Sequence, residues 1–312
     1  MKKHLWALCY SVCLLSFTVY MGLDTFVLSK SYDTAATAED TSAFEEESSQ
    51  IQELSSLDSS NKSDTEDTAD DGEVIGTYEN DNAVITVKEY TRNDTKVYVA
   101  DVTLTSSQYL KAAFANDTYG RNVKAKTSEI ASSNNAILAI NGDYYGAQES
   151  GYVIRNGVVY RDSAAGKEVL CVYADGSMEV VSDSDYTAQE LVDKGVWQAF
   201  SFGPGLVEDG EIAVDENDEV GKAMASNPRT AIGEIEDGHY VLVVADGRTD
   251  ESEGLSLKEL ASFMQELGCE TAYNLDGGGS STMYFNGEVI NNPTTTGHIS
   301  ERSVSDIVYI EE

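Results

Sequence analysis

Four short stretches of this sequence place acidic, amide or cationic side chains at one end of a segment that suits a strand. They are Asn141-Gly142-Asp143-Tyr144-Tyr145, Asn227-Pro228-Arg229-Thr230, Asp246-Gly247-Arg248 and Asn274-Leu275-Asp276-Gly277-Gly278-Gly279-Ser280. A fifth stretch adds Glu301 and Arg302 just before the last apolar segment. Carboxylates can act as nucleophile or general base, and guanidinium groups suit bidentate recognition of phosphate. Taken singly, each stretch also fits a plain alternative: an ordinary Asn-Gly turn at Asn141, or a surface ion pair at Arg229.

The three consecutive glycines, Gly277 to Gly279, are the most unusual of these features. Glycine runs lose much backbone entropy on folding, so they indicate unusual dihedral angles or close approach to a ligand. Their backbone amides can form an anion-binding nest, with Asp276 at its mouth. The stretch is neither a Walker loop, because no Lys follows, nor a nucleophile elbow, because Gly-x-Ser-x-Gly is absent. A flexible hairpin loop is the alternative.

Composition limits the partners. The chain has 312 residues, with 55 Asp and Glu against 20 Lys and Arg, for a net charge of −35. Such charge repels phosphate backbones and anionic lipid surfaces, so nucleic acid is not an expected partner. Three His residues leave little room for a His-built metal site. Several carboxylates close together could hold Ca²⁺ or Mg²⁺, but no EF-hand spacing occurs, so no cofactor is predicted and a divalent cation is the minority hypothesis.

In their order along the chain, these stretches resemble the phosphodiester glycosidase family. Phe202-Gly203-Pro204 and Glu301-Arg302-Ser303-Val304-Ser305 belong to the same set, and the Asn-Leu-Asp-Gly-Gly-Gly-Ser segment is its most specific part. Ser303 departs from the family, which often has Pro after Glu-Arg. The resemblance covers about 74–310 and implies an α+β catalytic domain. It also implies cleavage of the bond between the anomeric carbon of a sugar and a phosphodiester.

The resemblance also implies roles for individual residues. Such a reaction passes through an oxocarbenium-like transition state, which needs a carboxylate near the anomeric carbon and cationic contact with the phosphate. Asp276 is the first candidate for the carboxylate, as nucleophile or as base toward water, followed by Asp143, Asp246 and Glu301. The tyrosines at 144 and 145 could stack on a sugar. The predicted substrate-binding residues are Asn141, Gly142, Tyr144, Arg229, Thr230, Arg248, Asn274, Gly277, Gly278, Gly279, Ser280 and Arg302.

Two other functions fit the same residues. A non-catalytic protein could bind phosphate-linked envelope polysaccharide or exopolysaccharide in the same cleft without cutting it. A plain glycosidase would not need the phosphate, and loss of the Arg229 side chain would then matter little. The expected partner is a sugar-1-phosphodiester or a phosphate-linked polysaccharide.

The N-terminal part differs from the rest in composition. After Lys2 and Lys3, residues 5–23 carry no charge. This pattern predicts an uncleaved signal-anchor within 1–30, hence a single-pass cell-membrane protein with its C-terminal domain outside the cell. A cleaved signal peptide, giving a secreted protein, is the alternative. Residues 31–73 contain 14 Asp and Glu and one Lys, which predicts a disordered acidic linker.

The remainder, 74–312, is predicted to form one β-rich α+β domain with few helices. Alternating or continuously apolar segments predict strands at 83–89, 97–104, 136–140, 152–160, 240–244, 271–275 and 283–290. Helices are predicted at 256–267, after a Ser-x-x-Glu capping box, and at 187–194. Cys171 and Cys269 suit two small buried side chains better than a disulfide, although the sequence leaves both open.

Overall fold

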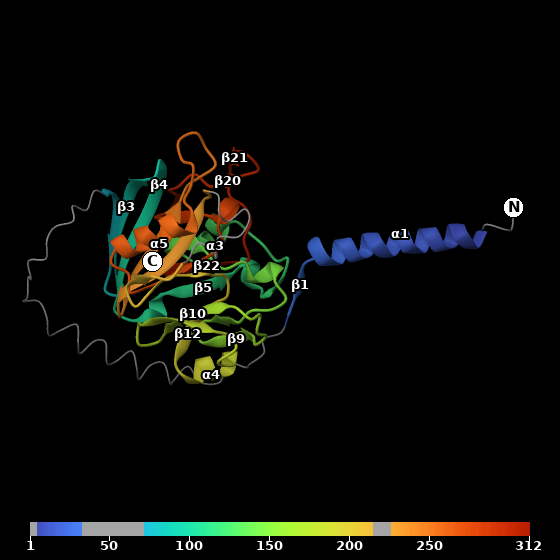
Figure 1. The fold of residues 1–312 in the computed structure, drawn as a ribbon, viewed down its shortest axis with the longest axis horizontal. Coiled ribbons are helices and arrows are strands. Elements are labelled where there is room, and N and C mark those ends of the chain that lie inside the picture. Colours follow the sequence, from blue (N-terminus) through green and yellow to red (C-terminus); the bar gives the residue numbers. More distant parts are fainter. Residues whose placement is uncertain (1–4, 33–71, 215–225) are drawn as a thin grey trace, which may run out of the picture.

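The computed structural model describes residues 5–32, 72–214 and 226–312. Within them, three antiparallel sheets pack around one large core, and three short helices cover their outer faces (Figure 1). The predicted β-rich α+β class is therefore confirmed. The predicted linker lies almost entirely outside the described residues, which resume shortly before the first strand of the domain.

The largest sheet has eight strands, in the order β14-β13-β17-β15-β16-β4-β3-β2. Helix α5 (Leu257–Glu266) packs on one face through an apolar stripe, and the other face contributes to the main core. The strands are β2 (Glu73–Glu79), β3 (Ala83–Arg92), β4 (Thr95–Leu104), β13 (Gly205–Glu208), β14 (Glu211–Ile212), β15 (Arg229–Glu236), β16 (His239–Ala245) and β17 (Thr271–Asn274).

Two five-stranded sheets complete the domain. One has the order β19-β18-β7-β22-β5 and is covered by helix α3, and the other has the order β11-β10-β12-β8-β9 and is covered by helix α4. Their elements are β5 (Lys111–Phe114), α3 (Thr127–Ser133), β7 (Ala136–Asn141), β8 (Val153–Arg155), β9 (Val158–Arg161), β10 (Glu168–Tyr173), β11 (Met178–Ser182), α4 (Ala188–Asp193), β12 (Val196–Phe200), β18 (Met283–Phe285), β19 (Glu288–Val289) and β22 (Asp306–Glu311).

Two short ribbons flank these sheets. They pair β1 (Lys30–Ser31) with β6 (Gly120–Arg121) and β20 (Thr294–Thr295) with β21 (His298–Ile299). Single turns of 3-10 helix occupy Ser107–Tyr109, Ala115–Asp117, Tyr145–Ala147 and Gly278–Ser280.

Most predicted elements are confirmed because local signals and tertiary packing agree. Ser256 and Thr187 accept hydrogen bonds from the backbone amides of Glu259 and Glu190, as the capping-box pattern predicts. Helix α3 was not predicted. At its N-terminus, the Lys126 amide donates to the Glu129 carboxylate, and the Ser128 amide donates to the carboxylate of Glu301, which lies 173 residues further along the chain.

The N-terminal segment forms helix α1 (Leu5–Phe26), which extends away from the domain in Figure 1. Across the residues described here, no helix is long and apolar enough to cross a membrane. The predicted membrane span within 1–30 is thus not supported. The end of α1 and the residues just after it contact the domain instead: Asn122 Nδ2 donates to the carbonyls of Thr25 and Leu28. Lys30, in the segment after α1, pairs with Asp24 of the helix at 2.7 Å.

Cys171 and Cys269 are free, buried thiols that belong to different apolar clusters. Burial raises the pKa of the Cys269 thiol to about 12, because an apolar environment disfavours the thiolate. The prediction of two small buried side chains is confirmed.

Glu234, on β15, generates a prediction about stability. Its carboxylate is 5% exposed, accepts a hydrogen bond from the Met178 amide at 3.0 Å, and has Asp237 and Asp175 as acidic neighbours. Burial, reinforced by these neighbours, raises the pKa of Glu234 from 4.5 to about 7. The folded protein therefore binds a proton that the unfolded chain releases, and this contribution to stability is lost as pH rises from about 4.5 to about 7.

We expect Glu234→Gln to stabilise the protein at pH 8 by roughly 1 to 3 kcal/mol relative to wild type, because glutamine keeps the acceptor without the charge. At pH 4.5 the two proteins should unfold alike. Urea unfolding at both pH values measures the difference. An equal effect at both pH values would contradict the assignment.

Candidate active site

The candidate site forms where the ends of three strands from two sheets meet. Asn141, at the end of β7, is fully buried, and its Nδ2 donates to the carbonyl of Asp276 at 2.6 Å. Its Oδ1 accepts from the Thr230 hydroxyl at 2.8 Å and from the Thr282 amide at 3.3 Å. The Asp276 amide in turn donates to the Gly142 carbonyl. Asn141 and Thr230, predicted to bind substrate, thus hold the backbone of Asp276 in place.

Asp276 is bound to an arginine and a serine. Arg302 Nη2 and the Ser280 hydroxyl donate to Asp276 Oδ2 at 2.7 and 2.6 Å, and Arg302 Nε donates to Ser280 Oγ at 2.8 Å. In the described part of the chain, Asp276 Oδ1 makes no hydrogen bond, and the side chain keeps 11% exposure. Burial raises the pKa of Asp276 above 3.8, although Arg302 and Ser280 lower it. One carboxylate oxygen is thus held, while the other has no hydrogen-bond partner among the described residues.

The glycine loop after Asp276 is tightly enclosed. A Cβ on Gly277 would lie 2.8 Å from the Pro228 carbonyl, and one on Gly279 would lie 2.7 Å from Thr295 Oγ1. Gly278 has a φ of +65°, and a Cβ there would lie 3.0 Å from Arg248 Nη2. The predicted unusual dihedral angle is found at Gly278, whereas the close approach at this loop is to other atoms of the protein, and approach to a ligand stays a prediction. The structure gives a specific reason for each glycine.

Two arginines flank this loop. Arg248 is exposed and sits in the left-handed region at φ +63°, with Nη2 3.0 Å from Asn227 Oδ1. Arg302 lies on the other side, where its Cβ would be 3.4 Å from a Cβ on Gly279. Both were predicted to bind substrate, and the fold brings both to the loop next to Asp276. Their positive charge suits an anionic group.

Tyr144 lies beside this cationic region. It is 36% exposed and occupies the left-handed region at φ 67°, ψ 23°, which is rare for a bulky residue and costs about 1 kcal/mol or more. The Arg302 and Lys124 side chains both lie 5.8 Å from its ring centroid. An exposed ring held under strain can stack on a sugar face, as predicted.

Asp143 lies in a buried cluster of charges. Its carboxylate accepts from the amides of Tyr145 and Ser201 and pairs with Arg155 at 3.0 Å. Arg155 also binds Asp306 Oδ2 through Nη2 at 2.7 Å, and all three side chains are almost fully buried. A Cβ on Gly142 would lie 2.3 Å from Asp306, so this glycine makes room for the cluster. Asp143 and Gly142 therefore position the Asp276 loop.

Asp246 is likewise engaged in holding loops together. It is 2% exposed, and Oδ1 accepts from Asn291 Nδ2 and the Asn292 amide, each at 2.9 Å. Asn291 Nδ2 also donates to the Ser281 carbonyl, so Asp246 ties the end of β16 to the segment that follows the glycine loop. Burial raises the pKa of Asp246.

Three more predicted residues direct their side chains to other partners. Glu301 accepts from Ser128 at the start of α3, with distances of 3.0 Å to the amide and 2.6 Å to the hydroxyl. Arg229 Nε donates to the Leu255 carbonyl at 2.8 Å. Asn274 Nδ2 donates to the Gly203 carbonyl at 2.8 Å. Their catalytic or substrate-binding roles stay predictions.

Sequence reasoning missed Arg155, Asp306 and Lys124. A signal for the first two existed, since each is a charged residue within an otherwise apolar strand segment. Lys124 lies in a loop with no distinguishing pattern. Among the described residues, no three His, Cys, Asp or Glu side chains are grouped so that they could hold a metal ion.

Comparisons with known proteins agree with this arrangement. Residues 134–311, more than half of the chain, match the model of the phosphodiester glycosidase family. The Bacillus subtilis SPbeta prophage-derived uncharacterized protein YomE is 31% identical over 180 residues, which is 56% of this chain and 28% of YomE. Mouse N-acetylglucosamine-1-phosphodiester alpha-N-acetylglucosaminidase is 33% identical over 146 residues, 44% of this chain and 28% of the mouse protein. The chain thus spans under a third of these relatives' lengths.

Solved structures share the fold. The catalytic domain of the zebrafish N-acetylglucosamine-1-phosphodiester alpha-N-acetylglucosaminidase, auto-inhibited by its pro-peptide, superposes with a TM-score of 0.59 at 22% identity. That match covers 78% of this chain and 88% of the zebrafish chain. A hypothetical protein from Synechocystis gives a TM-score of 0.57 at 15% identity, over 73% of this chain and 62% of the other. The family match and the geometry around Asp276 agree, and the chain belongs to the phosphodiester glycosidase family.

Proposed function

We propose that this domain hydrolyses the bond between C1 of a sugar and a phosphodiester. One observation supports this most: of the four predicted carboxylates, Asp276 alone lies at the glycine loop with an arginine on one oxygen and, among the described residues, no hydrogen bond on the other. Asp143 and Glu301 use both oxygens to position loops, and Asp246 uses Oδ1 in the same way, while its Oδ2 is buried without a partner among the described residues. The mammalian relatives are named for such an activity toward N-acetylglucosamine-1-phosphodiesters.

The geometry suggests a division of labour. The phosphate would lie between Arg248 and Arg302 over the glycine loop, and the sugar would stack on Tyr144. Asp276 Oδ1 would face C1, where positive charge develops as the C1–O bond breaks. The electron pair of that bond leaves with the phosphate monoester, and water supplies the new hydroxyl at C1. Because a phosphate monoester is a weak base, no strong general acid is needed.

We propose an envelope polysaccharide with sugar-1-phosphodiester links, encountered outside the cell. The chain as a whole is strongly acidic and should repel an anionic polymer. Arg248 and Arg302 offset this negative charge at the site, where the polymer would bind. The extracellular location stays a prediction.

We expect Asp276→Asn to lower the turnover of UDP-N-acetylglucosamine, or of the most active member of a sugar-1-phosphodiester panel, about 10³-fold or more, because asparagine cannot stabilise the developing charge. NMR of released sugar measures this and identifies the first anomer formed. Retention would assign Asp276 as nucleophile, and inversion as base. Asp193→Asn, at an exposed site on α4, is the matched control. Full activity in folded Asp276→Asn would refute the assignment, and no release from any substrate would favour a binding protein.

A second prediction separates phosphate recognition from sugar recognition. Arg248→Gln should lower kcat/KM for sugar-1-phosphodiesters about 10-fold to 100-fold, since charge-assisted contacts to phosphate are strong. Hydrolysis of a p-nitrophenyl glycoside of the same sugar should change little. Arg92→Gln, which removes an arginine paired with Glu266 elsewhere on the surface, is the control. Equal loss on both substrates would refute phosphate recognition by Arg248, and little loss on either would argue for a plain glycosidase.

A third prediction concerns pH. Asp276 must be ionised to act, so the rate should fall as pH decreases through its pKa, with a midpoint above the ordinary 3.8. Since Arg302 lowers this pKa, Arg302→Met should move the midpoint of kcat to higher pH as well as slow the reaction. Rate profiles between pH 3.5 and 8 test this, and a midpoint that stays fixed or moves to lower pH would contradict it.

A further inference from the structure

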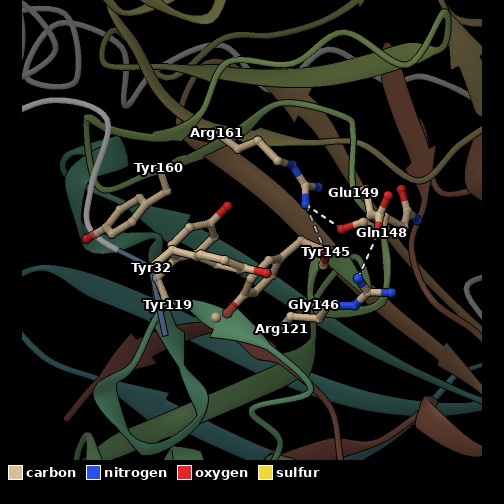
Figure 2. A pocket seen from close by; sticks show the side chains of 10 residues that line it. Tyr32, Tyr119, Arg121, Tyr145, Gly146, Gln148, Glu149, Tyr160 and Arg161 are labelled. Carbon is tan, nitrogen blue, oxygen red and sulfur yellow. Dashed lines mark hydrogen bonds and ion pairs between the residues drawn. The ribbon is translucent and has the colours of Figure 1, made fainter. Parts of the chain in front are cut away.

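A cavity of about 380 Å³ lies next to the candidate active site and takes no part in the mechanism above. Figure 2 shows tyrosine rings gathered on one side and two arginines, with Gln148 and Glu149, on the other. Its lining residues are Tyr32, Tyr119, Gly120, Arg121, Tyr145, Gly146, Gln148, Glu149, Tyr160 and Arg161.

The cavity and the active site are built from the same two chain segments. Tyr144 belongs to the site and the next residue, Tyr145, lines the cavity. On the other segment, Lys124 lies over the Tyr144 ring and Arg121 lines the cavity. The Asn122 amide joins the two segments by a hydrogen bond to the Gly146 carbonyl. A polymeric substrate bound at the candidate active site can therefore reach the cavity with its neighbouring units.

The aromatic wall is rigid and amphipathic. The Tyr119 and Tyr145 rings are stacked, 5.3 Å apart, and Tyr160 lies 5.3 Å from Tyr119. Tyr32, from the segment after α1, adds a half-exposed ring 5.9 Å from Tyr119, and its amide donates to the Tyr119 carbonyl. Tyr119 and Tyr145 are 9% and 2% exposed and support the wall from behind. Tyr32 and Tyr160 are the more exposed rings, and they offer apolar faces for stacking and hydroxyls for hydrogen bonds, which suits a sugar ring.

The polar wall has unused hydrogen-bonding capacity. Arg161 donates to the carbonyls of Tyr145, Gln148 and Gly151, but its buried Nη2 has no partner within the described residues. Buried polar atoms without partners are rare in folded proteins and mark places where a ligand can supply the missing group.

The charge of this wall favours an acidic ligand. Arg121 pairs with Glu149 at 2.6 Å, but the Glu149 side chain is 78% exposed, so a ligand carboxylate can replace it at little cost. Two arginines in one cavity are a local excess of positive charge in a chain of net charge −35. A guanidinium binds a carboxylate through paired, planar hydrogen bonds.

We propose that this cavity is a second carbohydrate subsite, which binds an acidic sugar residue of a glycan whose neighbouring units reach the candidate active site. The pairing of the two sites on one substrate rests on the proposed function. Binding at the cavity does not, because it requires no hydrolysis.

Isothermal titration of the full chain with tri-galacturonic acid tests the proposal, with maltotriose as the uncharged probe. We expect saturable binding of the acidic probe, at least about tenfold tighter than that of maltotriose. Arg121→Gln and Tyr32→Ala should each weaken it about fivefold to tenfold. Arg92→Gln, whose arginine is paired in the same way on another surface, should leave it unchanged. Both cavity variants change surface-accessible side chains, and circular dichroism checks their folding.

Absence of binding, or equal binding of both probes, would overturn the proposal. Equal loss in Arg92→Gln would overturn it too, because it would show a general charge effect. If hydrolysis is observed without glycan binding, only this inference fails. If the acidic probe binds but no sugar-1-phosphodiester is cleaved, only the proposed function fails.

Discussion

The buried cluster of Arg155, Asp143 and Asp306 is the constraint on which the site depends. Its members come from β8, from the loop after β7 and from β22, so it joins the two five-stranded sheets. Burying three charges is unfavourable unless each is paired, and removing any one would strand the others. The Arg155 guanidinium also stacks on Phe200, 4.2 Å from the ring centroid, and donates to the Ala199 carbonyl. The cluster therefore fixes the Asn141–Tyr145 turn in one geometry.

Hydrogen bonds between uncharged groups connect that turn to Asp276. Asn141 and Gly142 bond the backbone of Asp276, and Asp246 and Glu301 hold the surrounding loops from two further directions. Strain at Tyr144 and close packing at the glycines are tolerated because this network over-determines the loop. Most of the polar residues around the site thus orient it, and a small number face solvent to meet a substrate.

Electrostatics explains how so acidic a chain can approach an anionic substrate. Arg248 and Arg302 flank the glycine loop, and Arg121 and Arg161 line the neighbouring cavity. Elsewhere, several described basic side chains pair with surface carboxylates, such as Lys96 with Glu89. At physiological salt, exposed charges are screened beyond about 8 Å, so local arginines outweigh the distant acidic surface.

The sequence by itself determined the class of fold, most strands, two capped helices and the segments that make the site. Those features follow from local rules: alternation, capping boxes and the entropy of glycine. It ranked Asp276 ahead of Asp143, Asp246 and Glu301 only through the family resemblance, because all four stand close to one end of a predicted strand. Only the tertiary structure decided how the oxygens of each carboxylate are used, and it did so through partners far away in sequence: Ser201 for Asp143, Asn291 for Asp246 and Ser128 for Glu301. The same holds for Arg229 and Arg248. The sequence does not show that the Arg229 guanidinium donates to a backbone carbonyl, whereas the Arg248 guanidinium lies at the glycine loop.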